Sequence, residues 1–183
     1  MEDERFQTRV ELGRHSYMCW DSKRRENVFV RKTMREDDEH YNSLRSILVV
    51  KVMNFTPALL RDTNVIPILD FEENSNKDVL CVVYPFFEYN LKSLVAQYGL
   101  GPEEIKNIIF QVLRGVQYMH GKSIIHRNLT PTSILFDIAQ GDPEYLSAYV
   151  GGYRLSRPLG HSGLSPLTNQ GNLRFKAPEL LLV

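Results

Sequence analysis

The sequence predicts an α+β protein in which an antiparallel β part comes before a helical part. Short β-prone segments, separated by Gly13 and by charged or polar turns, fill most of residues 1–84. A long amphipathic helix pattern follows over residues 102–120, with apolar side chains at intervals of three and four. At 183 residues the chain suits one domain, or one domain and part of another.

The composition indicates a soluble globular protein, because 43% of the residues are hydrophobic and 24% are charged. The 22 basic and 22 acidic residues cancel, which predicts no general attraction to nucleic acid or to an anionic membrane. The two cysteines, Cys19 and Cys81, suit a reducing compartment better than a disulfide-linked secreted domain. An acidic start without a signal peptide, and no long apolar segment, favour the cytoplasm or the nucleus.

The β part contains five predicted strands and one predicted helix. Its strands are rich in β-branched and aromatic residues and are bounded by turn formers: Phe6–Leu12, Tyr17–Trp20, Val28–Thr33, Val65–Phe71 and Val79–Tyr84. Between the third and fourth strands, apolar residues on one face predict a helix from Asp38 to Val52.

The second part begins with two predicted helices. Asn90 can cap a short helix that Gly99 ends, and Pro102 suits the first position of the longer helix, which Gly121 ends. A further strand is predicted from Tyr145 to Val150.

The stretch from Ser123 to Asp137 is the most informative one, because a polar loop separates two β-prone runs. Pro131 fixes φ, and the polar residues around it favour turns: Asn128, Thr130, Thr132 and Ser133. Counted from His126, the spacing resembles the catalytic loop of protein kinases, H-R-D-L-x-x-x-N followed by an apolar strand.

Two later stretches match further protein kinase motifs in order and spacing. Gly152–Arg157 occupies the position of D-F-G-L-S-R, and Gly171–Leu181 resembles G-T-x-x-Y-x-A-P-E-L-L, as in serine/threonine kinases of the cyclin-dependent style. The chain is therefore identified as similar to the protein kinases, since an unrelated α+β domain would need several coincidences at once. The resemblance implies a small lobe at 1–84, a hinge at 85–90 and a partial large lobe at 91–183, truncated after the A-P-E box.

The resemblance also implies where catalysis would occur, and the residues at those positions have changed. Asn128 replaces the aspartate that accepts the substrate proton, and Thr130 replaces a lysine near the transferring phosphoryl group. Ser133 and Gly152 replace the asparagine and the aspartate that hold magnesium. Since an amide cannot act as a carboxylate base, we expect the shape of the loop to persist without its chemistry.

For nucleotide binding, the match of Phe29–Lys32 to V-A-I-K implies that Lys32 is the retained phosphate-binding group. Gly13 is the only glycine kept from G-x-G-x-x-G-x-V, and Trp20 replaces the valine above the adenine. Tyr84 would be the gatekeeper before the hinge. The implied nucleotide-binding positions are Leu12, Gly13, Val30, Lys32, Phe87 and Leu135.

Two functional hypotheses follow. The favoured one is a pseudokinase, a binding or scaffolding module with no magnesium site and weak or absent ATP binding. We expect it to associate with a protein partner or with itself, because Phe110 and Tyr118 widen the apolar stripe of the helix at 102–120. The alternative is an atypical serine/threonine kinase that holds ATP through Lys32 and uses an acid from outside the motif, such as Asp137.

Overall fold

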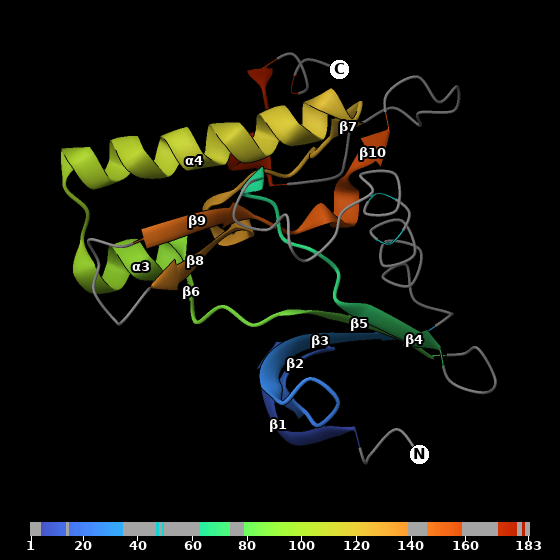
Figure 1. Cartoon of the computed structure of the whole chain (residues 1–183). Helices are drawn as coiled ribbons and strands as arrows, with labels where there is room; N and C mark the ends of the chain where they lie inside the picture. Colours follow the sequence, from blue (N-terminus) through green and yellow to red (C-terminus); the bar gives the residue numbers. More distant parts are fainter. Residues whose placement is uncertain are drawn as a thin grey trace.

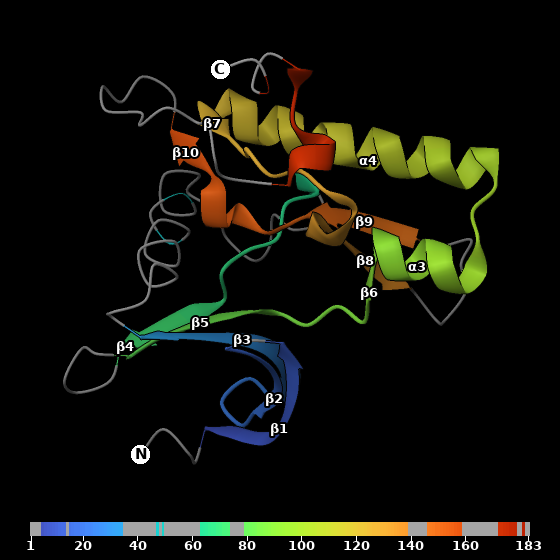
Figure 2. The ribbon, with the colours of Figure 1, turned by 180° about the vertical axis from the view of Figure 1, so that it is seen from behind.

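The computed structural model describes residues 5–13, 15–34, 47, 49, 63–73, 79–138, 146–158, 172–178 and 181. One curled sheet of strands β1 to β5 forms the lower part of the molecule in Figure 1, and the helices α3 and α4 lie in the upper part with the shorter strands. Seen from behind in Figure 2, the same two parts are joined by the segment that precedes β4 and the segment that follows β5. This arrangement confirms the predicted α+β class with an antiparallel β part and a partial helical part.

The sheet of the lower part contains five strands in the order β1-β2-β3-β5-β4, and every neighbouring pair is antiparallel. Its strands are β1 (Phe6–Gly13), β2 (Ser16–Asp21), β3 (Glu26–Met34), β4 (Asp70–Glu73) and β5 (Val79–Pro85). One face carries a small core of side chains that are at most 4% exposed: Phe6, Cys19, Val28, Val30, Cys81 and Val83. Both cysteines are buried in this core and form no disulfide bond.

The fourth strand is shorter than the sequence predicts, because Val65 and Ile66 pair elsewhere. Val65 forms a parallel bridge with Val150, and the amide of Ile66 donates to the carbonyl oxygen of Val150 at 2.9 Å. The amide of Val150 donates in turn to the carbonyl oxygen of Asn64 at 2.8 Å. These backbone groups are therefore not available to β5, and β4 begins only at Asp70.

An ion-pair network fastens the start of β1 to the far edge of the sheet. The Arg5 guanidinium lies 2.9 Å from a carboxylate oxygen of Asp21 and 3.0 Å from one of Asp70, and it also pairs with Glu72. Burial alone would raise the pKa of the Asp21 carboxyl, but the hydrogen bonds from Arg5 and from the amide of Lys23 hold that pKa below its ordinary value. The network thus stabilises the ionised carboxylate inside the lower part.

Among the described residues, the upper part contains two α-helices and two small sheets. Helix α3 (Leu91–Tyr98) has a capping box formed by Asn90 and Ser93, and Gly99 follows it with φ of 68°. Helix α4 (Pro102–Gly121) extends one residue beyond its predicted end. Strands β6 (Tyr89–Asn90), β8 (Ile134–Ile138) and β9 (Leu146–Val150) form one sheet, and β7 (Ile124–Ile125) pairs with β10 (Arg157–Pro158). The predicted helix from Asp38 to Val52 lies outside the described residues except for Ile47 and Val49, which are helical and buried.

Helix α4 lies beside β9 in both views, and a glycine allows their close approach (Figures 1 and 2). A Cβ atom at Gly115 would lie only 2.6 Å from the carbonyl oxygen of Asn64 and 2.8 Å from Cγ2 of Val150. One turn earlier, the Gln111 side chain accepts from the Ala148 amide at 2.8 Å and donates to the Leu146 carbonyl at 3.1 Å. Through Gln111, helix α4 therefore provides hydrogen-bond partners for two backbone groups of β9.

We expect Gly115→Ala to lower the free energy of unfolding by about 1–3 kcal/mol, because the added methyl group must displace backbone and a buried valine. Gly121→Ala is the matched control, since a Cβ there meets nothing within 4 Å and alanine favours the helix. Urea unfolding of both variants checks this expectation. Equal stability of the Gly115 variant and the wild type would show that the contact between α4 and residue 64 is loose.

Candidate functional site

A cavity of about 440 Å³ lies between the β1–β5 sheet and the loops of the upper part. Cavities of this size accommodate small molecules in other proteins. From the β1–β5 sheet it is lined by Leu12 of β1 and by Phe29 and Arg31 of β3, and Ile66 lines it from the segment before β4. The remaining lining residues come from the end of β5, the segment after it and the upper part: Tyr84, Pro85, Phe86, Phe87, Glu88, Asn90, Thr132, Leu135, Gly151, Gly152 and Tyr153.

The pleat of β3 decides which of its two neighbouring cations faces this cavity. Phe29 and Arg31 line it, whereas Val28 and Val30 point into the core on the opposite face. Because side chains alternate along a strand, Lys32 shares the face of Val30 and is not among the described residues that line the cavity. The structure therefore differs from the expectation for both Val30 and Lys32 and places Arg31 at the cavity instead.

Of the other positions implied to bind a nucleotide, some line the cavity and one does not. Leu12, Phe87 and Leu135 line the cavity, whereas Gly13 does not, although it ends β1 next to Leu12. Trp20, which the sequence places above an adenine, is 40% exposed and is not part of the lining. The aromatic side chain that the sequence analysis missed is Phe29, whose ring centroid lies 6.0 Å from that of Tyr84 on the neighbouring strand. The alternation of side chains along β3, with Val28 and Val30 on the core face, was the signal that could have identified Phe29.

The polar side chains at the catalytic-loop positions form most of their hydrogen bonds within the loop itself. Ser133 Oγ accepts from the Thr130 amide at 2.9 Å and donates to the Thr130 carbonyl at 2.8 Å, closing the 3₁₀ turn Pro131–Ser133. The hydroxyl groups of Thr130 and Thr132 are 3.0 Å apart. Asn128 accepts through Oδ1 from the Asn172 amide at 3.2 Å, which links the loop to residues 172–178. Asn128, Thr130 and Ser133 therefore support the loop, and only Thr132 lines the cavity.

A buried histidine and a buried tyrosine hold the segment that follows β9. His126 Nε2 lies 2.7 Å from the carbonyl oxygen of Gly151, and since a carbonyl only accepts, Nε2 carries the proton. The Tyr153 hydroxyl donates toward the carbonyl oxygens of Ile66 and Val150, at 2.8 and 2.5 Å. The two rings meet edge to face with centroids 6.1 Å apart. Burial lowers the pKa of His126 and raises the pKa of Tyr153 well above its ordinary value.

The residues of this cleft do not fit a magnesium ion. Magnesium binds through oxygen ligands, usually one or two carboxylates together with phosphates and water. Gly152, in the left-handed region with φ of 75°, offers no side chain, and the Ser133 hydroxyl is occupied inside its turn. Within the described residues, no group of three or more His, Cys, Asp or Glu side chains could hold a metal. Asp137 is exposed on β8 and is not among the lining residues.

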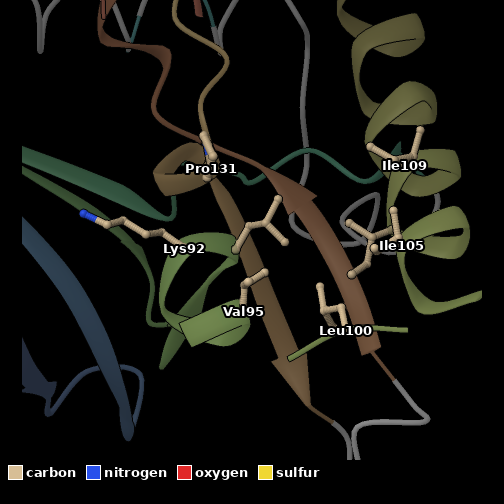
Figure 3. Close-up of a pocket in the computed structure, with 8 residues that line it drawn as sticks. Lys92, Val95, Leu100, Ile105, Ile109 and Pro131 are labelled. Atoms are coloured by element: carbon tan, nitrogen blue, oxygen red, sulfur yellow. The ribbon is translucent and has the colours of Figure 1, made fainter. Parts of the chain in front are cut away.

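A second, apolar hollow of about 390 Å³ lies between α3 and α4. Figure 3 shows Val95 and Leu100 on one side of it, facing Ile105 and Ile109 of α4, with Pro131 of the loop at its upper end. The apolar surface continues along α4, where Phe110 and Leu113 are 62% and 60% exposed. This surface is called the α3–α4 face below and is defined by Val95, Leu100, Ile105, Ile109, Phe110 and Leu113.

Comparison with known proteins gives a match over nearly the whole chain. A family model described as "protein kinase domain" matches residues 13–182. Cyclin-dependent kinase 11B of Homo sapiens is 28% identical over 185 residues, which cover 98% of this chain and 22% of the relative. Probable cyclin-dependent kinase 8 of Dictyostelium discoideum is 30% identical over 131 residues, covering 67% and 34%. Cyclin-dependent kinase B2-1 of Arabidopsis thaliana is 26% identical over 170 residues, covering 85% and 50%.

The chain thus spans at most half the length of these three curated relatives. Over the ranges that the structure describes, the helices lack the combination of length and apolar character needed to cross a lipid bilayer.

We expect the free energy of unfolding to fall as the pH drops below about 6.5, because folding lowers the pKa of His126. The unfolded chain then binds a proton that the folded chain does not bind, so the stability that His126 contributes is fully present above that pH and is lost progressively as the pH falls toward the lower pKa of the folded state. Each such proton changes the stability by about 1.4 kcal/mol per pH unit. The network around Arg5 titrates at lower pH, since the pKa values of Asp21 and Asp70 lie below 3.8.

His126→Gln isolates this effect, because the amide can still donate to Gly151 but does not titrate. Denaturant unfolding between pH 5 and 8 should give a flatter curve for this variant. The exposed His120 at the end of α4 supplies the control His120→Gln, which should keep the pH dependence of the wild type. Identical pH curves for His126→Gln and the wild type would contradict the assignment.

Proposed function

The chain belongs to the protein kinase family, and we propose that within it this chain is a pseudokinase, a binding module that does not transfer phosphate. One observation carries the proposal: the loop frame of the family is kept while the groups that hold metal and accept the proton are replaced. Asn128 stands at the position of the base, and Ser133 and Gly152 stand at the positions of the metal ligands. We also propose the division into a small lobe at 1–84, a hinge at 85–90 and a partial large lobe at 91–183.

The energetic argument is that phosphoryl transfer depends almost entirely on positioning and on neutralising charge. Loss of one preorganised stabilising group costs roughly two to three orders of magnitude in rate in other enzymes. Here the proton acceptor and both metal ligands are replaced together, and the Ser133 hydroxyl closes a turn instead of facing the cavity. We therefore propose that ATP binds weakly or not at all and that magnesium does not assist it.

Two features of the structure weigh against the rival hypothesis of an atypical kinase. Lys32 shares the core-side face of β3, and Asp137 is exposed and away from the cavity lining. Arg31 could contact a phosphate group, but a guanidinium supplies neither a proton acceptor nor a metal ligand. Phosphate transfer is accordingly the less supported function for this chain.

We propose the α3–α4 face as the surface through which this module binds a protein partner or a second copy of itself. Four large apolar side chains of α4 are 47–62% exposed on it: Ile105, Ile109, Phe110 and Leu113. Contiguous apolar patches of this kind on soluble proteins usually mark an interaction site. Two cysteines without a disulfide bond and a net charge of zero support our proposal of an intracellular setting, cytoplasmic or nuclear, with no role for nucleic acid or membrane.

We expect no incorporation of phosphate when the chain is incubated with labelled ATP, Mg²⁺ or Mn²⁺ and generic protein substrates, because the metal ligands and the base are missing. Arg31→Met and Lys32→Met serve as paired controls, since only the first removes a cation from the cavity. Incorporation by the wild type that disappears in Arg31→Met would show that the cleft transfers phosphate and would overturn the proposal.

We expect the purified chain to self-associate and to bind a hydrophobic dye through the α3–α4 face. Phe110→Glu should shift it toward the monomer and lower dye binding, because a charge then replaces a side chain that is 62% exposed on this face. Asn107→Glu introduces the same charge at an exposed residue of α4 outside the defined face, and it should change both properties less than Phe110→Glu does. Light scattering and dye fluorescence are the measurements, and a wild-type monomer without dye binding would rule out this use of the face.

A further inference from the structure

We propose that the α3–α4 face binds a second copy of this chain, with the two α4 helices antiparallel and Leu113 of each copy in the hollow between α3 and α4 of the other. The inference rests on the proposed function in one respect, the use of this face for association, and it adds the partner and the geometry of the pair. Three properties of the face support it: its shape, the row of apolar side chains along α4, and the charges at the two ends of that helix.

The α3–α4 face has a hollow part and a projecting part along the same helix. The hollow of about 390 Å³ lies at the N-terminal half of α4, where Ile105 and Ile109 face Val95 and Leu100 (Figure 3). Leu113, one turn beyond Ile109, is not among the residues that line the hollow and is 60% exposed. A surface that carries both a hollow and a projecting apolar side chain can be complementary to itself, as a two-fold dimer requires.

The exposed apolar side chains of α4 form a row that can pair with itself. Ile105, Ile109 and Leu113 follow one another at intervals of four residues, so they lie on one side of the helix. When a two-fold axis passes beside Gln111, near the middle of the helix, Ile109 of one copy lies opposite Leu113 of the other, and the reverse pair forms as well. Because Ile109 lines the hollow, this register places Leu113 of each copy at the hollow of the other.

The charges of α4 favour the antiparallel orientation over the parallel one. Glu103 and Glu104 lie in the first turn, where Lys106 offsets one of the two charges at 3.3 Å from Glu103. Arg114 lies in the second half of the helix, and Lys122 follows its end. Antiparallel copies bring the acidic end of one helix to the basic end of the other, and their helix dipoles also attract. Complementarity of this kind fixes orientation more than affinity.

The size of the face predicts a weak dimer. A helix of 20 residues is about 30 Å long and about 10–12 Å wide with its side chains. Two such helices, packed along their length, bury roughly 600–800 Å² in total. Stable protein interfaces bury about 1,200–2,000 Å², and interfaces below this range belong to transient complexes. We therefore expect association at micromolar concentrations and above.

Sedimentation equilibrium of the whole 183-residue chain over a wide range of concentrations measures the affinity. We expect a monomer–dimer equilibrium, and Leu113→Glu should weaken it by about tenfold or more, because a charge then enters an apolar hollow. Asn107→Glu, at an exposed residue outside the face, should weaken it by less than about twofold. Urea unfolding verifies that both variants fold. Unchanged affinity in Leu113→Glu would overturn the proposal, as would growth beyond the dimer, because a two-fold contact is closed.

Cysteine cross-linking tests the orientation. Ile109→Cys and Leu113→Cys are purified separately, mixed and oxidised mildly, and the linked peptides are identified by mass spectrometry. The antiparallel register brings these two positions together, so the mixed disulfide should form faster than a disulfide between two copies of either variant. The native Cys19 and Cys81 are at most 2% exposed, and oxidised wild type gives their background. Faster linkage between equal positions would indicate a parallel pair and would overturn the proposal.

These measurements separate this inference from the proposed function. A chain that stays monomeric at all concentrations but binds a hydrophobic dye would overturn the dimer and leave the α3–α4 face as a surface for a different protein. A monomer without dye binding would overturn both the dimer and the use of this face. Phosphate transfer is measured independently, so its outcome leaves the result for the dimer intact.

Discussion

The backbone of Val150 is the point on which the rest of this structure depends. Its amide donates to Asn64, and its carbonyl oxygen accepts from the Ile66 amide and lies 2.5 Å from the Tyr153 hydroxyl. Helix α4 approaches the same residue so closely that only glycine fits at position 115. A buried backbone group without a partner is costly, so each of these bonds constrains the others. In this way Val150 connects the segment of residues 64–66, helix α4 and the segment after β9.

This junction explains how the kinase frame can be held independently of the side chains at the positions of the catalytic motifs. The bonds of Val150 and the His126 bond to Gly151 involve backbone carbonyls and amides, which a change of catalytic side chain does not remove. At the altered positions the new side chains have structural uses of their own. Ser133 closes its 3₁₀ turn, and Asn128 holds the Asn172 amide. The stability of the loop and its catalytic capacity are therefore separate properties.

In the cavity, too, the residues that stabilise the fold can be distinguished from those that carry charge. Its walls are formed by residues that also belong to the core or to its border, such as Ile66, Tyr153 and Leu135. Such residues remain because they pack, whether or not a nucleotide binds. Charged residues are few in this cavity, and Arg31 and Glu88 carry its formal charge among the described lining residues.

The sequence by itself determined the elements that depend on local chemistry. The capped helix α3, the amphipathic helix α4, the strands with alternating apolar residues and the order of the motifs were all predictable, because caps, periodicity and turn residues act over a few positions. The assignment of Asn128, Ser133 and Gly152 to the positions of catalytic residues stays a prediction from motif spacing.

Only the tertiary structure decided which side of β3 faces the cavity. Arg31 and Lys32 are adjacent cations, and a shift of one residue moves every side chain of a strand to the opposite face. The pairing of β3 with β2 and β5 buries Val28 and Val30 on the core side, and this places Arg31 at the cavity. The early end of the predicted fourth strand has a similar cause, since Val65 and Ile66 pair with a residue more than 80 positions away. Choices of this kind depend on long-range contacts, which local sequence patterns do not contain.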